Sequence, residues 1–351
     1  MKDQHYIEHV LVEALADEKA EGKSILISGA WGCGKTYLWK NLIASEFSEK
    51  KPITLSLFGL NSIDTLKKLL VNECLVRKVR QVANKEVSEA ASGIWKWLNY
   101  GGRKFAEKKL GIDLIGAHLD SLQLVSDNLI ICFDDVECIS ESVSLESVFG
   151  FANMLAEVKF AKVVLIMNEA HLLSRPDTVD VMKRYKERVF SISIAVEADT
   201  DAVFDNRVKH YSSDKKVTEV LLRQRSRILG VFHRTQTTNL RTLVRIIDSI
   251  AKLCASTNAE LILDKHIHFL VALSMEAQNG ELRERNYYDT SEFFILYAFE
   301  RNRQKLAESN EGIIKFYNTY YGEQERGAFE FSSAIYDFVK NGYINTSKLN
   351  D

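Results

Sequence analysis

The sequence predicts an α/β fold in which a doubly wound parallel sheet is followed by an all-helical domain. Up to about residue 200, short apolar segments alternate with helical ones, which is typical of a parallel sheet covered on both faces. After that point apolar residues recur at helical spacing over 217–232, 239–254, 264–278 and 290–308. We therefore expect a core over 1–200 and a helical lid over 201–351.

Five short segments are expected to form the strands of the sheet. They are rich in aliphatic residues or phenylalanine and cover 24–28, 53–59, 128–133, 162–167 and 189–196. The third is apolar after Asn128, as expected for a strand covered on both faces. Helices are expected over 3–20, over 37–43, from about 62 to 74, and over 144–158.

The loop between the first strand and its helix carries the strongest chemical signal. Residues 29–36 spell G-A-W-G-C-G-K-T and match G-x-x-x-x-G-K-[ST], the P-loop of NTPases. Its glycines let backbone N–H groups surround phosphates, and the helix behind it directs its positive end at them. Lys35 is expected to reach the β and γ phosphates, and Thr36 to hold Mg²⁺. We expect ATP to contact Gly29, Trp31, Gly32, Cys33, Gly34, Lys35, Thr36 and Tyr37.

Acidic residues follow the third strand at the edge where a P-loop sheet binds its ligand. The sequence there is Asp134-Asp135-Val136-Glu137. In a parallel sheet, ligands bind at the carboxyl ends of the strands. We assign Asp134 to Mg²⁺, directly or through water. Asp135 is the first candidate to orient or deprotonate the attacking water, and Glu137 is the second.

Polar residues near the fourth and fifth strands are further candidates. Asn168 follows the fourth strand, where it either senses the γ phosphate or the attacking water or serves as a turn or cap residue. Arg184 and Arg188 precede the fifth strand. Each is a candidate arginine finger acting between subunits, and the alternative is a solvated charge run.

A stretch at about 75–127 is longer than a simple α/β connection requires. It begins with the basic run 77–80 and carries Trp95, Trp97 and Tyr100. Such a segment either contacts a membrane surface, a nucleic acid or a neighbouring subunit, or is a packed structural insertion.

Composition narrows the classes of protein that remain. The chain has 351 residues, is 46% hydrophobic and 27% charged, and has a net charge of -2, which gives no overall attraction to nucleic acid or anionic membrane. It has no run of 18 apolar residues and no apolar signal-peptide core, so we expect no transmembrane segment. The five cysteines lack zinc or disulfide spacing, which favours a reducing, cytoplasmic setting.

Three motifs resemble those of the bacterial KAP-type P-loop NTPases, on the STAND and AAA+ side of the NTPases. The loop is similar to their G-x-W-G-x-G-K-[ST], with Trp31 as the distinguishing residue. Residues 134–138 resemble their D-D-L-[DE]-R, with Cys138 in place of arginine. Residues 239–245 are similar to N-P-R-x-L-x-R, with Leu240 in place of proline, and this likeness implies that Arg241 reaches the nucleotide as a sensor.

The resemblance covers residues 1 to about 250 and implies a 5-1-4-3-2 strand order and a lid that moves with nucleotide state. Many relatives carry membrane-spanning helices between the two phosphate motifs, a place that the insertion at 75–127 occupies without them. Several bacterial relatives act in excluding phages. The resemblance thus favours an ATPase switch that forms homo-oligomers with nucleotide, acts on a protein effector and belongs to an anti-phage system.

Three alternatives stay open. The first is a nucleotide-gated scaffold with negligible hydrolysis, favoured by the Cys138 departure. The second is a loader-type ATPase on DNA, for which Arg223, Arg225 and Arg227 form a basic cluster. The third is a small-molecule kinase, a class that usually lacks a long helical lid. The choice between ATP and GTP also stays open, although the guanine motif N-K-x-D is absent.

Overall fold

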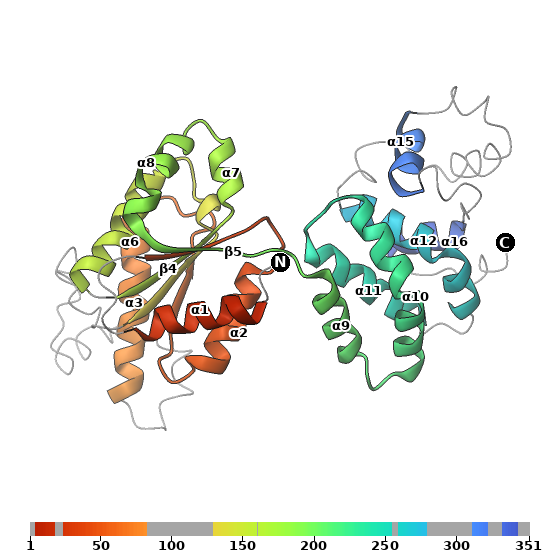
Figure 1. Ribbon diagram of the computed structural model, residues 1–351, viewed down its shortest axis with the longest axis horizontal. Coiled ribbons are helices and arrows are strands. Elements are labelled where there is room, and N and C mark those ends of the chain that lie inside the picture. Colours follow the sequence, from red (N-terminus) through yellow and green to blue (C-terminus); the bar gives the residue numbers. More distant parts are fainter. Residues whose placement is uncertain are drawn as a thin grey trace, which may run out of the picture. The chain divides into compact units, whose positions relative to one another are not determined.

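Figure 1 shows the computed structural model of the chain. The structure describes residues 4–17, 24–82, 129–159, 161–254, 259–278, 311–321 and 332–342. The chain divides into two compact units, Met1–Glu197 and Ala198–Asp351. The first unit contains the sheet, and the described elements of the second are helices.

The sheet of the first unit is parallel. Its described strands are β1 (Ser24–Ser28), β2 (Ile53–Ser56), β3 (Ile130–Asp134), β4 (Lys162–Met167) and β5 (Phe190–Ala195), in the order β2-β3-β4-β1-β5. The predicted α/β fold class is therefore confirmed, and the strand order is the 5-1-4-3-2 order that the family resemblance implied. The second strand ends at Ser56, earlier than predicted, because the chain then turns with a hydrogen bond from Leu60 N to Leu57 O.

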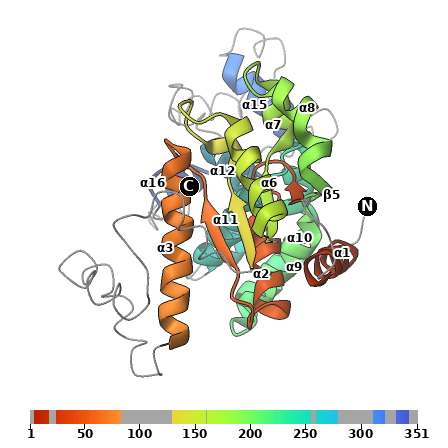
Figure 2. The same ribbon diagram turned by 90° about the vertical axis from the view of Figure 1, so that its left-hand side faces the viewer.

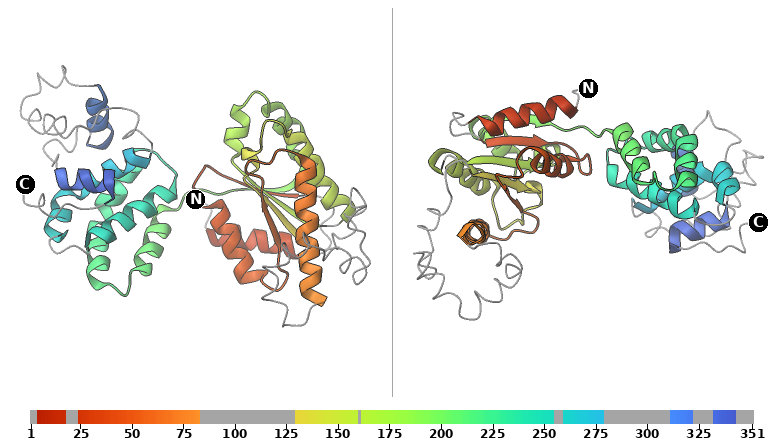
Figure 3. Two further views of the ribbon diagram at one scale, coloured as in Figure 1. Left: turned by 180° about the vertical axis from the view of Figure 1, so that it is seen from behind. Right: turned by 90° about the horizontal axis from the view of Figure 1, so that it is seen from below.

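Helices cover both faces of this sheet (Figures 1 and 3). One face packs against α1 (Gln4–Ala16) and α2 (Lys35–Glu46), and the other against α3 (Ile63–Val82), α6 (Leu145–Lys159) and α8 (Val179–Val189). The strands alternate accordingly. On β3, Ile130 and Cys132 belong to the first apolar cluster, whereas Ile131 and Phe133 belong to the second.

The helix α3 runs beside β2 and extends further along the chain than predicted (Figure 2). Ser62 stabilises its start, because the Ser62 hydroxyl accepts a hydrogen bond from the Thr65 N–H over 3.1 Å. Since α3 ends at Val82, the basic run 77–80 lies within it. The rest of the insertion, including Trp95, Trp97 and Tyr100, lies outside the described residues.

Two α-helices of the first unit were not predicted, α7 (Glu169–Ser174) and α8. The segment of α8 is dominated by charged residues, and its fully buried side chains are Met182 and Val189. Met182, Tyr185 and Val189 recur at helical spacing and all contact the core, but the charged residues between them mask this period in the sequence. The helix is nevertheless held at a second point, where the Lys186 ammonium contacts Glu169 of α7 at 2.5 Å.

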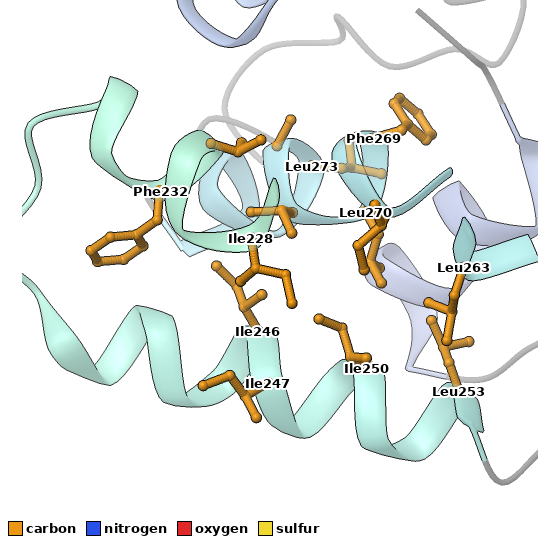
Figure 4. Close-up of a cluster of buried hydrophobic side chains, with 14 of the residues drawn as sticks. Ile228, Phe232, Ile246, Ile247, Ile250, Leu253, Leu263, Phe269, Leu270 and Leu273 are labelled. Carbon is orange, nitrogen blue, oxygen red and sulfur yellow. The ribbon is translucent and has the colours of Figure 1, made fainter. Parts of the chain in front are cut away.

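The second unit has its own hydrophobic core, part of which Figure 4 shows. Its described helices are α9 (Thr200–His210), α10 (Lys215–Arg234), α11 (Leu240–Cys254), α12 (Ala259–Gln278), α15 (Glu311–Tyr320) and α16 (Ser333–Asn341). Phe232 of α10, Ile246 of α11 and Leu270 of α12 all belong to this core. The predicted helical segment 290–308 lies outside the described residues.

Aromatic residues of α15 and of the position directly after it belong to this core. Phe316, Tyr320 and Tyr321 are buried. Among the helices that the structure describes, none combines the length and hydropathy needed to span a bilayer.

Candidate functional site

The phosphate loop joins β1 to α2 through two left-handed glycines. Gly32 has φ +75° and Gly34 has φ +103°, conformations that residues with a Cβ atom rarely adopt. Gly34 is the N-cap of α2, and no side chain caps this helix. The first N–H groups of α2 are therefore left for another acceptor, and the helix dipole favours an anion there.

Gly29 is required for a different reason, which is lack of space. A Cβ atom at Gly29 would lie 2.5 Å from the Val196 carbonyl oxygen and 2.7 Å from the Cys33 sulfur. The loop thus lies directly against the chain that follows β5. Burial raises the pKa of the Cys33 thiol, so this side chain acts as a neutral packing group in the loop.

Lys35 is held inside the loop by backbone oxygens. Its ammonium donates to the carbonyls of Gly29 at 2.7 Å and Ala30 at 3.0 Å, and the residue is 8% exposed. A nearly buried ammonium bound to neutral carbonyls gains from an anionic partner, because charge-assisted hydrogen bonds are stronger than those to neutral acceptors. Phosphate oxygens are such partners.

Thr36 and Asp134 bring two oxygens together at the mouth of the loop. The Thr36 hydroxyl donates to Asp134 Oδ2 over 2.9 Å, and the Asp135 N–H donates to Asp134 Oδ1 over 2.9 Å. Burial raises the pKa of Asp134, and the bond from Thr36 opposes that shift. The carboxylate is thus desolvated, and a bound cation would offset the free-energy cost of that desolvation.

These two residues fit Mg²⁺. Neighbouring ligands of an octahedral Mg²⁺, each about 2.0–2.1 Å from the metal, lie about 2.9 Å apart, which matches the Thr36–Asp134 oxygen separation. The described residues contain no group of three or more His, Cys, Asp or Glu side chains arranged to hold a metal. A site of two protein oxygens suits Mg²⁺, which keeps several waters and also binds the phosphates of a substrate.

Asp135 has a left-handed backbone. Its φ is +56°, and it stands at the N-cap position of the short helix η4 (Val136–Cys138), where its side chain makes no capping hydrogen bond. Its Oδ2 atom accepts a hydrogen bond from the Ser56 hydroxyl over 2.8 Å. Ser56 ends the neighbouring strand β2, opposite Asp134. Sequence reasoning missed Ser56, and the signal that could have found it is its position at the end of a strand beside β3.

Glu137 and Trp31 form the next contact. The indole N–H of Trp31 donates to Glu137 Oε1 over 2.8 Å, and the Trp31 ring packs on the His171 ring with centroids 4.6 Å apart. Glu137 is 4% exposed, and its Oε2 atom is buried without a partner among the described residues. His171 was also missed, since nothing in the sequence connects it to the loop.

Asn168 follows β4 and caps α7. Its Oδ1 atom accepts from the His171 N–H over 3.2 Å, and the residue is 8% exposed. The cap interpretation is therefore correct for the oxygen. The NH₂ group, for which the described residues show no partner, leaves the sensor interpretation open.

The remaining candidates occupy separate places. Tyr37 is exposed on α2, and Arg184 and Arg188 are exposed on α8. Arg241 belongs to the second unit, where it is exposed in the first turn of α11 and its N–H donates to Asn239 Oδ1. Their roles toward a nucleotide stay predictions.

The predicted basic cluster of α10 is engaged in contacts within its own unit. Arg223 contacts the Asp264 carboxylate at 2.9 Å, Arg225 contacts the Asp201 carboxylate at 2.6 Å, and Arg227 donates to the Asp264 carbonyl. These acidic partners reduce the positive potential that a phosphate backbone would meet.

No protein-family model and no curated protein matches this sequence. Among solved structures, the chain is similar to a DNA replication initiation factor, with 13% identity, a TM-score of 0.43, and coverage of 91% of this chain and 84% of that one. It is also similar to Drosophila ORC bound to DNA, with 12% identity, a TM-score of 0.39, and coverage of 95% of this chain and 84% of that one. Both TM-scores are low, so we draw no functional conclusion from either likeness.

Proposed function

We propose that this protein is a Mg²⁺-dependent ATPase that switches between states as ATP is bound and hydrolysed. The observation that carries the proposal is the 2.9 Å approach of the Thr36 hydroxyl to the Asp134 carboxylate beside a helix start that no side chain caps. Mg²⁺, when bound, neutralises phosphate charge and stabilises the charge that develops during transfer.

Each residue of the site has a distinct task. Lys35 leaves the loop carbonyls and binds phosphate oxygens, while Thr36 and Asp134 hold the metal. Asp135 orients the attacking water and accepts its proton, since this residue is only partly buried at the ligand edge of the sheet. Asn168 donates its NH₂ group to the γ phosphate or to the water.

We further propose that Arg241 of the second unit senses the γ phosphate. Arg184 or Arg188 serves as a finger for a neighbouring subunit, since both are exposed on α8. Nucleotide-dependent homo-oligomers would then act on a protein effector, with anti-phage defence as the setting. These finer statements rest on the family resemblance of the motifs.

A second candidate function is a nucleotide-gated scaffold that hydrolyses ATP very slowly. The Ser56–Asp135 hydrogen bond favours it, because this bond occupies the carboxylate that would activate water. Cys138, which stands where the resembling family has arginine, favours it as well. The DNA-loader alternative gains no support from α10, where the arginines have partners within the unit.

Steady-state phosphate release from ATP across a range of protein concentrations tests the proposal, with K35A as the blank. Turnover per chain that rises with concentration supports an active site completed between subunits, and R184A and R188A then identify the finger. Turnover above the blank that is independent of concentration excludes an arginine finger supplied by a neighbouring subunit. Turnover at the blank level, with ATP binding intact, favours the scaffold. Stimulation by DNA that falls steeply with salt would favour the loader.

A further inference from the structure

Three residues that are far apart in the sequence meet at the tip of the phosphate loop. Trp31 of the loop donates its indole N–H to Glu137 of η4 over 2.8 Å. On another side, its ring packs on His171 of α7 with an interplanar angle of 46°. The loop tip is therefore attached both to the acidic motif and to the helix that follows β4.

The contact matters most to Glu137, because this carboxylate is buried. Removing a carboxylate from water is costly unless donors replace the water. Trp31 supplies one donor, to Oε1, and Oε2 has no partner among the described residues. Trp31 itself is 52% exposed, so burial of its ring does not fix its position. The two side chains thus hold each other, and breaking the bond leaves a buried carboxylate with neither oxygen satisfied.

We propose that Glu137 is a positioning residue that fixes the phosphate loop through the Trp31 indole, and that it does not activate the attacking water. This inference rests on the nucleotide site proposed above and assigns the water to Asp135 alone. Asp135 is half-buried at the carboxyl edge of the sheet with one oxygen bonded to Ser56, whereas one Glu137 oxygen is engaged by Trp31 and the other is fully buried.

The same contact links the loop to the candidate sensor. His171, on which Trp31 packs, donates its backbone N–H to the Asn168 side chain. Holding Trp31 in place therefore also sets the distance between the loop and Asn168. A loop released from Glu137 would bind phosphate less tightly, because its N–H groups would no longer be pre-organised.

Four variants separate positioning from chemistry. E137Q keeps an oxygen that can accept from the Trp31 indole but loses the basicity of the carboxylate, and E137A loses both. W31F keeps a ring against His171 and loses the N–H. The matched control is W39F, since Trp39 donates its indole N–H to Thr54 Oγ1 over 2.9 Å on the α1/α2 face of the sheet.

The kinetic expectation is an effect on KM rather than kcat. E137A and W31F should each raise the KM for ATP about tenfold, and the double variant should be no worse than either single one, because both remove one contact. E137Q should shift KM less than E137A, and W39F should not reproduce the KM effect. A fall in the kcat of E137Q of about 100-fold at unchanged KM, the scale of a lost general base, would overturn the proposal.

A measurement without nucleotide tests the contact itself. The chain has four tryptophans, and replacing Trp95 and Trp97 by phenylalanine leaves Trp31 and Trp39. Trp39 is 1% exposed, so quenching by acrylamide reports on Trp31. We expect the quenching constant to rise about twofold in E137A, as the loop tip is released, but not in E137Q. An unchanged constant in E137A would overturn the inference. If ATP does not bind at all, the proposed function fails, whereas the quenching result still decides whether Glu137 holds Trp31.

Discussion

The two units of this chain use their charged side chains in different ways. In the helical unit, the Arg207 guanidinium bonds Asp248 through two N–H groups at 2.7 and 2.8 Å, and the Tyr211 hydroxyl donates to the same carboxylate. At the sheet edge of the first unit, Lys35 instead donates to carbonyls of its own loop, and Glu137 has one buried oxygen with no partner among the described residues. Arg207 and Asp248 therefore neutralise each other within the fold, whereas Lys35 and Glu137 show no oppositely charged partner among the described residues, as the proposed nucleotide site would require.

The largest effect is expected for K35A. Removing the ammonium should weaken ATP binding about 100-fold and reduce phosphate release to the rate measured without protein, on the scale of losing one pre-organised donor. Titration calorimetry with Mg²⁺-ATP measures it. K40A is the matched control, because Lys40 is exposed on the same helix. If K40A weakens binding as much as K35A, general positive charge and not the loop lysine binds the phosphates.

D134N should be more stable than the wild type without ligand and less stable than the wild type with Mg²⁺-ATP. Because the folded pKa of Asp134 is raised above 3.8, its ionised form costs stability above the folded pKa, and the cost disappears as pH falls below 3.8. At pH 7 the free variant should therefore melt higher than the wild type, and the gap should close as pH falls. With Mg²⁺-ATP the wild type should instead melt higher than D134N, because the variant should bind Mg²⁺-ATP about tenfold more weakly. Melting curves from pH 4 to 8, with and without Mg²⁺-ATP, measure both effects. A free variant less stable than the wild type at pH 7 would contradict the desolvation argument.

D248A should lower stability without changing the affinity for ATP. It leaves Arg207 and Tyr211 without their shared acceptor, which should cost about 2 kcal/mol. The pair is only partly exposed, whereas the Arg225–Asp205 contact is longer, at 3.4 Å, and more exposed. D205A should therefore cost less than about 1 kcal/mol. Urea denaturation compares the two variants, and equal losses would show that the Arg207–Asp248 geometry adds nothing.

S56A is expected to have the smallest effect. It frees the Asp135 carboxylate from the hydroxyl that now bonds it, so basal kcat should rise about threefold while the affinity for ATP is unchanged. Single-turnover phosphate release measures the chemical step. S45A, at an exposed serine of α2, is the control. A fall in kcat in S56A would mean that Ser56 orients Asp135 for the reaction and does not restrain it.

The sequence predicted the parts of the site that the topology alone brings together. Thr36 follows β1 and Asp134 ends β3, and in a parallel sheet the carboxyl ends of the strands share one edge. Ser56 ends the strand that the implied order places beside β3, so its position was within reach, but a serine at a strand end is not a distinctive signal. His171 could not be found in this way, because its contact with Trp31 depends on the helix α7, which the sequence did not predict. The helix α8 was missed because its many charged residues mask the helical spacing of Met182, Tyr185 and Val189.

The aromatic residues near the carboxyl end differ from Ser56 and His171, because their burial can be expected from residue type alone. Phe316, Tyr320 and Tyr321 are buried and belong to the core of the second unit. Burial follows from hydrophobicity, which every residue carries in its own type. The partners of a polar side chain depend on the whole fold, so hydrogen bonds such as Ser56–Asp135 appear only once the fold is known.

Because Gly29 has no Cβ atom, the phosphate loop packs closely against the segment that follows β5. The backbone of the phosphate loop lies so close to the Val196 carbonyl that not even a methyl group fits between them. Val196 is also hydrogen-bonded to Ser28 and stands one residue before the boundary at Glu197. The first residue of the phosphate loop and the segment with which the chain leaves the first unit are thus in direct contact. A ligand that displaces the loop at Gly29 must therefore also displace Val196 and the backbone that directly follows β5.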